Sequence, residues 1–262
     1  MLALACTLLF TMIIHTTDSL SYALRLGGLR ARRIGLALTV AGMLLLVSRT
    51  SNMVQGPMLG SIADQARLTA QDPLEWKLHA ILGAATIGTL LAVLLFPAVV
   101  RISARLVVHL EAAGSVGGMI RRLVQQARWR HIGYYVKRPN RSMALSLLRG
   151  SFPKRLVLLN LLVTAVYTVG VLAAVYASYL WPEHATSMSM SSGLINGGAT
   201  ILLTLLIDPR LALLSERAVR GDLRLEGMSR IYGWMLLSRL GGTLLAQLLL
   251  VPFAYWLGWI IG

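Results

Sequence analysis

The sequence predicts an all-α integral membrane protein with about six transmembrane helices and amphipathic connecting helices. Of its 262 residues, 56% are hydrophobic and 13% charged, and the mean hydropathy is +0.69. The core of an ordinary water-soluble domain cannot absorb this much apolar surface. Apolar stretches of about 20 residues, the length that crosses a bilayer, also recur along the chain between basic connections. The composition and the spacing therefore indicate the same class.

Six segments are apolar and long enough to span a membrane, and we treat 1–262 as a single polytopic domain. In order, they cover approximately 1–24, 34–59, 79–100, 156–181, 186–207 and 231–261. The long connection 101–155 predicts amphipathic helices that lie on the inner leaflet. The connection 208–230 predicts a charged helix, because it places Glu216 four residues before Arg220 and Glu226 four residues before Arg230.

Basic residues orient these spans. The connections 25–33, 101–155 and 208–230 hold 21 of the 25 Lys and Arg residues, against only Arg67 and Lys77 in the other two connections. The positive-inside rule places basic connections in the cytoplasm, so both termini are expected outside. The same rule accounts for the net charge of +15, and we therefore expect no nucleic-acid partner.

Polar side chains interrupt the first two spans. His15, Asp18 and Arg25 lie on one stripe of the first helix, because three- and four-residue steps return to the same face. A charge inside a span costs about 2.5–3.5 kcal/mol and usually faces a cavity or a partner. Arg49 has no acidic residue on its own helix, and guanidinium groups bind phosphate bidentately. The second span therefore predicts a lining for an anionic ligand, made of Ser48, Arg49, Thr50, Ser51, Asn52 and Gln55.

The later spans extend this polar seam through Asn196 and Arg239. Counted at about 1.5 Å per residue, Asp18 and Arg239 lie about 10–14 Å deep, and a buried ion pair between them is one interpretation. Arg49 lies about 24 Å from the inner end of its span by the same count. We therefore predict a ladder of polar groups that rises from a cytoplasmic mouth to Arg49 near the outer leaflet. The mouth consists of Arg25, Arg30, Arg32 and Arg33. Close packing of small residues is the alternative for the seam around Asn196.

Several classes of enzyme lack their motifs in this sequence. The spans contain no DxxD-type carboxylate cluster for Mg²⁺, and the five histidines are scattered. There is no Walker A loop for nucleotide hydrolysis. Cys6 is the only cysteine, which leaves no disulfide within the chain and no cysteine-based zinc site. We therefore expect neither catalysis nor a cofactor or metal.

Two stretches carry a specific resemblance: HTTDSLSYALRLGGLRARRIGLALTV, from His15 to Val40, and LVSRTSNMVQGPMLG, from Leu46 to Gly60. They resemble the Amj family of bacterial membrane proteins, the alternates to MurJ as lipid II flippases. The resemblance is close over about the first 60 residues. Over the rest of the chain it consists of the same plan of six spans at a similar length. It implies movement of the undecaprenyl-pyrophosphate-linked peptidoglycan precursor, lipid II, from the inner to the outer leaflet of the plasma membrane.

The expected partners follow from the resemblance and from the basic connections. They are lipid II, the anionic lipids of the membrane and, for a homodimer, a second copy of the chain. Two other functions stay open at this point. One is a flippase or recycler of a simpler polyprenyl phosphate, and the other is a membrane scaffold in which the polar seams only hold helices together.

Overall fold

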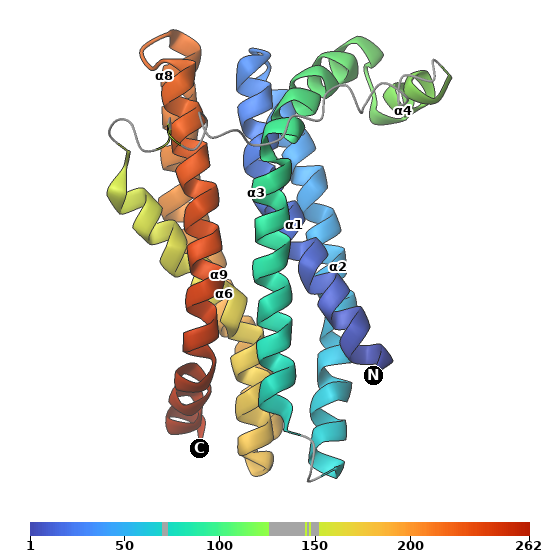
Figure 1. Cartoon of the computed structure of the whole chain (residues 1–262), viewed down its shortest axis with the longest axis vertical. Coiled ribbons are helices and arrows are strands. Elements are labelled where there is room, and N and C mark those ends of the chain that lie inside the picture. Colours follow the sequence, from blue (N-terminus) through green and yellow to red (C-terminus); the bar gives the residue numbers. More distant parts are fainter. Residues whose placement is uncertain (70–72, 126–144, 146, 148–151) are drawn as a thin grey trace.

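The computed structural model describes residues 1–69, 73–125, 145, 147 and 152–262. Within those ranges six helices are long and apolar enough to cross a membrane, which confirms the predicted all-α membrane class. The chain runs up and down six times along the long axis of the molecule (Figure 1), and both termini lie at one end. The basic connections 25–33 and 208–230 and the described part of 101–155 lie at the other end, which we call the basic end.

The spanning helices are α1 (Leu2–Arg30), α2 (Ile34–Leu68), α3 (Leu74–Ala113), α6 (Lys154–Leu180), α7 (Ala185–Leu202) and α9 (Leu225–Ile261). The short helix α4 (Val116–Gln125) follows α3, and the 3-10 turn η2 (Pro182–His184) precedes α7. A π turn, η3 (Leu203–Ile207), continues α7 into α8 (Asp208–Arg220).

The helices extend beyond the apolar segments that predicted them. The second span was expected to end at 59, but α2 continues to Leu68, and α9 begins at Leu225 rather than at 231. Hydropathy detects only the part of a helix that lies in hydrocarbon, whereas backbone hydrogen bonding continues into the interface. The predicted helix in 208–230 is confirmed only over Asp208–Arg220 as α8, with Glu216 and Arg220 paired at 3.6 Å, whereas Glu226 and Arg230 belong to α9. In 101–155 the described part up to Gln125 is helical except at Gly114 and Ser115, which separate α3 from α4, and most of the remainder lies outside the described residues.

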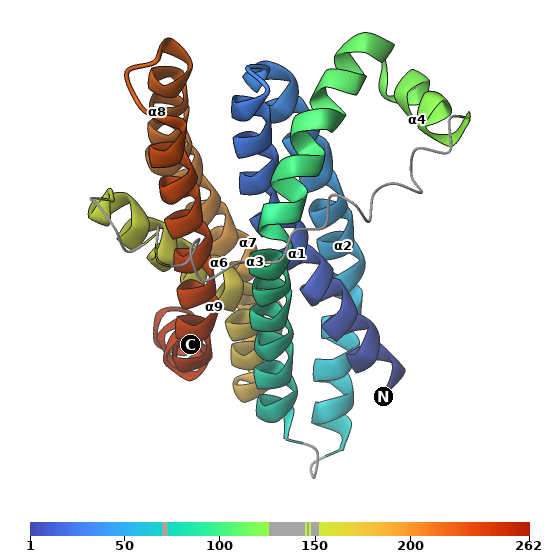
Figure 2. The same cartoon turned by 45° about the horizontal axis from the view of Figure 1, so that its top comes forward.

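The six spans form two groups of three (Figures 1 and 2). In the first group α1 packs against α2 and α3, and in the second α6 packs against α7 and α9. Contacts of α9 with α1 and α3 join the groups. Two apolar clusters fill the interior, one toward the termini around Leu78 and Ala246 and one toward the basic end around Leu26 and Met235. The buried polar side chains of α1 and α9 lie between these clusters along both helices.

The two groups share a sequence motif and a packing contact. α3 contains GTLLAVLL (Gly88–Leu95) and α9 contains GTLLAQLL (Gly242–Leu249), which differ at one position. A Cβ atom at Gly88 would lie 2.5 Å from the backbone oxygen of Met12 in α1, and one at Gly242 would lie 2.7 Å from that of Leu161 in α6. Each glycine thus lets the third helix of its group approach the backbone of the first. Since α1 and α6 run in opposite directions (Figure 1), the groups follow one plan with inverted orientation.

Candidate functional site

A polar cavity lies between the two groups of helices, and we call it the central cavity. Its volume is about 80 Å³. Five charged side chains from four helices line it, and they are Asp18 and Arg25 of α1, Arg49 of α2, Asp208 of α8 and Arg239 of α9. Neutral residues of α6 and α7, among them Tyr167 and Thr200, complete the wall. The cavity therefore collects the predicted charged residues of the spans at one place.

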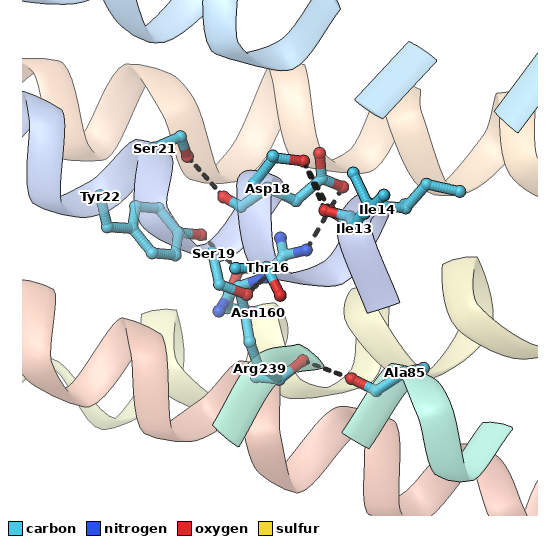
Figure 3. A network of polar contacts seen from close by, with 12 residues as sticks. Ile13, Ile14, Thr16, Asp18, Ser19, Ser21, Tyr22, Ala85, Asn160 and Arg239 are labelled. Carbon is cyan, nitrogen blue, oxygen red and sulfur yellow. Dashed lines mark hydrogen bonds and ion pairs between the residues drawn. The ribbon is translucent and has the colours of Figure 1, made fainter. Parts of the chain in front are cut away.

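Asp18 and Arg239 form the buried ion pair that their similar depth suggested. The Arg239 Nη2 atom lies 3.5 Å from Asp18 Oδ2, and the two side chains are 9% and 13% exposed. Arg239 Nε also donates a hydrogen bond of 3.1 Å to Ser19 Oγ. Figure 3 shows the guanidinium between these two α1 side chains. This contact ties the first helix of one group to the third helix of the other.

A second ion pair closes the cavity toward the basic end. Arg25 Nη1 lies 2.9 Å from Asp208 Oδ1, and the side chains are 16% and 38% exposed. The sequence placed Arg25 in the cytoplasmic mouth and gave it no partner. The pairing depends on how α8 packs against α1, which no local pattern in either helix encodes.

Arg49 is the charged residue of the cavity that stays unpaired. It is exposed and makes no hydrogen bond or ion pair with any residue in the described ranges. The three arginines and two aspartates therefore leave one positive charge in the cavity. An uncompensated guanidinium in such a place favours an anionic ligand.

The expected position of Arg49 near the outer leaflet is wrong. It lines the same cavity as Asp18 and Arg239, so these residues lie at a similar level. α1 and α2 are antiparallel neighbours, and Gln55 Nε2 donates a 2.7 Å hydrogen bond to Thr11 Oγ1, a register that brings Arg49 opposite Asp18. The error arose because the end of the first span was set at 24, whereas α1 continues to Arg30.

A second cavity, which we call the neutral cavity, adjoins the central one. Its volume is about 40 Å³, and Tyr167 lines both cavities. Three polar atoms at its wall are buried without a hydrogen-bond partner among the described residues: His15 Nδ1, Thr168 Oγ1 and Asn196 Oδ1. This volume is enough for at least one water molecule. The predicted residues His15, Asn52, Gln55 and Asn196 all meet here.

The remaining predicted residues of the second span line neither cavity. Ser48 and Ser51 are buried, and Ser51 Oγ donates to the Val47 backbone oxygen at 2.8 Å. Thr50 is exposed. A helix presents only about a third of its positions to any one neighbour, so a polar run of this length cannot face a single cavity.

The arginines of the predicted mouth lie at the end of α1. Arg30 donates a 3.1 Å hydrogen bond to Ser229 of α9, and Arg33 pairs with Glu111 of α3 at 2.6 Å. Arg32 has a φ angle of 56° in the turn before α2. Two of the three therefore link helix ends at the basic end in this structure.

Sequence reasoning missed a buried network beside the ion pair. Tyr22 Oη donates to Asn160 Oδ1 at 3.0 Å, and Asn160 Nδ2 donates to the Met235 backbone oxygen at 3.0 Å and to Ser238 Oγ at 2.7 Å. Figure 3 shows Tyr22 and Asn160 on the Ser19 side of Arg239. Asn160 starts a row with Thr164 and Thr168 at four-residue steps on α6, but its hydrogen-bond partners come from α1 and α9. In the part of the chain that the structure describes, no three His, Cys, Asp or Glu side chains come together as a metal site.

Comparison with known proteins gives two matches. The family model described as Amj, Alternate to MurJ, matches residues 10–261. A protein of Bacillus subtilis (strain 168) named lipid II flippase Amj is 36% identical over 252 residues, which cover 96% of this chain and 94% of that protein. No solved structure matches the chain.

Proposed function

The chain belongs to the Amj (Alternate to MurJ) family, and we propose on that premise that it moves lipid II from the inner to the outer leaflet of the bacterial plasma membrane. In this role it supplies the precursor for peptidoglycan synthesis. The observation that carries the proposal is the unpaired Arg49 beside two ion pairs in one intramembrane cavity. A polyprenyl pyrophosphate needs such a charge to cross the apolar layer.

The two cavities match the two kinds of group in this substrate. The pyrophosphate is anionic, and the guanidinium of Arg49 can bind two of its oxygens at once. Arg239 can join if the pyrophosphate replaces Asp18 at the guanidinium, which exchanges one anionic partner for another. The sugar and peptide groups are rich in hydroxyl and amide groups, and the unpartnered atoms of the neutral cavity supply matching donors and acceptors.

The headgroup requires a larger space than this structure provides. Ligand pockets usually measure about 300–1,000 Å³, whereas the central cavity has about 80 Å³. The two groups of helices must therefore move apart for the headgroup to pass. We expect the movement beside α2, because α2 packs mainly on α1 and only weakly on α6. The prenyl chain can then stay in the bilayer while the headgroup moves between the groups.

The direction of transport depends on the orientation of the chain. We propose that the basic end faces the cytoplasm and that both termini lie outside. Support comes from the sequence, because 21 of the 25 Lys and Arg residues belong to the connections 25–33, 101–155 and 208–230.

The test replaces Arg49 with glutamine and measures how much lipid II becomes accessible in the outer leaflet of cells depleted of other flippases. A lost charged hydrogen bond of about 1.5–3 kcal/mol predicts a decrease of about tenfold or more. Protein abundance in the membrane should stay normal, because Arg49 makes no hydrogen bond or ion pair with the described residues. Thr50→Val on the same helix is the matched control, since Thr50 is exposed and lines neither cavity.

Two outcomes would change the assignment. Unchanged export by the Arg49→Gln variant would remove the role given to the central cavity. A scaffold instead predicts that export falls only in proportion to protein abundance. A headgroup-resolved binding assay separates lipid II from a simpler polyprenyl phosphate, because only lipid II offers sugars to the neutral cavity.

A further inference from the structure

A larger cavity lies at the basic end, outside the site described above, and we call it the α6–α8 pocket. It has a volume of about 550 Å³ and lies between the start of α6 and one face of α8. Four basic side chains line it: Lys154 and Arg155 from α6, and Arg210 and Arg217 from α8. This volume is in the range of ligand pockets.

The face of α8 in this pocket is both basic and apolar. Arg210, Leu213, Leu214 and Arg217 follow the spacing i, i+3, i+4 and i+7, so they lie on one side of the helix. Leu213 is 61% exposed. The face therefore offers an apolar surface with an arginine one turn away on either side. A molecule with an anionic group and an apolar chain fits this pattern, whereas a small hydrophilic anion leaves the leucines uncovered.

The charges of the pocket have no internal compensation. No carboxylate is among its described lining residues, and none of the four cations makes an ion pair with a residue in the described ranges. The first turn of α6 adds backbone N–H groups without a side-chain cap, and the positive end of the helix dipole increases the attraction for an anion. Like charges held in one cavity repel each other, and a bound anion removes that repulsion.

We propose that the α6–α8 pocket binds the phosphate group of an anionic lipid in the adjacent leaflet, with the lipid chain along Leu213. The level in the membrane supports this occupant. α7 and η3 together cover residues 185–207, about 34 Å at about 1.5 Å per residue, while the hydrocarbon core is about 30 Å thick. α8 therefore begins where the phosphate groups of the leaflet lie.

The pocket also lies next to the central cavity. On α6, Leu156 lines the pocket and Val163 lines the cavity, two turns or about 10 Å further along. On α8, Asp208 of the cavity is two residues before Arg210 of the pocket. A pyrophosphate lipid held at the pocket is thus positioned to move to Arg49. This loading role rests on the proposed function, whereas binding of a phosphate lipid does not.

The experiment measures lipid binding to the purified full chain in a neutral detergent by native mass spectrometry. The probes are phosphatidylglycerol, undecaprenyl pyrophosphate, phosphatidylcholine and inorganic phosphate, each titrated separately. The variant Arg210→Gln with Arg217→Gln should bind anionic lipid at least about tenfold more weakly than the unchanged chain. The control Arg220→Gln with Arg224→Gln removes the same charge from exposed positions outside the pocket and should bind normally.

Each result supports or overturns the proposal. Loss of undecaprenyl pyrophosphate binding alone assigns a loading position for the substrate, and loss for both anionic lipids assigns a general phosphate-lipid site. Unchanged binding by the pocket variant, or equal loss in the control, overturns the site. Inorganic phosphate or phosphatidylcholine bound as tightly as the anionic lipids overturns the ligand class. Arg49→Gln should keep pocket binding, so failure here is distinct from failure of the proposed transport.

Discussion

Removing Asp18, Arg239 or both should show that the two side chains act as a pair. Their closest charged atoms are 3.5 Å apart, and both side chains are almost fully buried. Asp18→Asn leaves an arginine in the membrane interior without its anionic partner, although the hydrogen bond to Ser19 remains. Arg239→Gln leaves a buried carboxylate. The double change leaves two neutral amides that can hydrogen-bond to each other.

The expected magnitudes follow from the distance and the burial. At 3.5 Å and an effective dielectric constant of about 20, the attraction between the charges is about 5 kcal/mol. Either single change should lower the free energy of unfolding by about 3–5 kcal/mol, because it leaves an uncompensated buried charge. The double change should cost about 1–3 kcal/mol. The double change should therefore cost about 6 kcal/mol less than the sum of the two single changes, a coupling above the value of about 3 kcal/mol that marks the upper end for residues in contact.

The assay is reversible unfolding of the purified protein in mixed micelles, followed by circular dichroism. It is applied to the four proteins of a double-mutant cycle: the unchanged chain, the two single variants and the double variant. A second cycle on Arg25 and Asp208 is the internal comparison. Its carboxylate is 38% exposed, so its coupling should be nearer about 1 kcal/mol. A double change as damaging as the sum of the two single changes would refute the pairing and its place in the exchange with pyrophosphate.

Three further predictions concern topology and packing. Single cysteines introduced at Thr69 and at Gly117, in a chain that carries Cys6→Ser, should react differently with a membrane-impermeant maleimide. We expect position 69 to react in intact cells and position 117 to react only after permeabilisation. The reverse pattern overturns the proposed orientation. Gly88→Ala should lower the free energy of unfolding by about 1–3 kcal/mol, because the new Cβ atom meets the backbone of α1. The control Gly42→Ala places its Cβ atom in open space and should raise the free energy of unfolding by up to about 1 kcal/mol. Equal effects of the two changes in an unfolding assay would contradict the close approach of α3 to α1. Asn160→Ala should lower the unfolding midpoint by removing partners from three buried groups, and a midpoint equal to that of the unchanged protein would show that the network adds no stability.

The sequence alone determined the class of protein and the number of spans. A bilayer imposes a minimum length on apolar helices and a bias on basic connections, and both constraints act on local sequence. The similar depth of Asp18 and Arg239 could also be read by counting residues from the basic connections. The ion pair was therefore predictable, because the depth of a residue in the membrane follows from its distance along the sequence from the end of its span.

Tertiary packing alone decided how each helix is rotated about its own axis and how far it is shifted along its neighbours. Arg49 was placed at the wrong level because hydropathy does not show how far α1 continues beyond hydrocarbon, and the antiparallel register with α2 depends on that length. The partnership of Arg25 with Asp208 and the meeting of α6 with α8 in a basic pocket join residues that are distant in sequence. Such contacts depend on which faces of several helices meet, and that choice is made by the packing of the whole bundle.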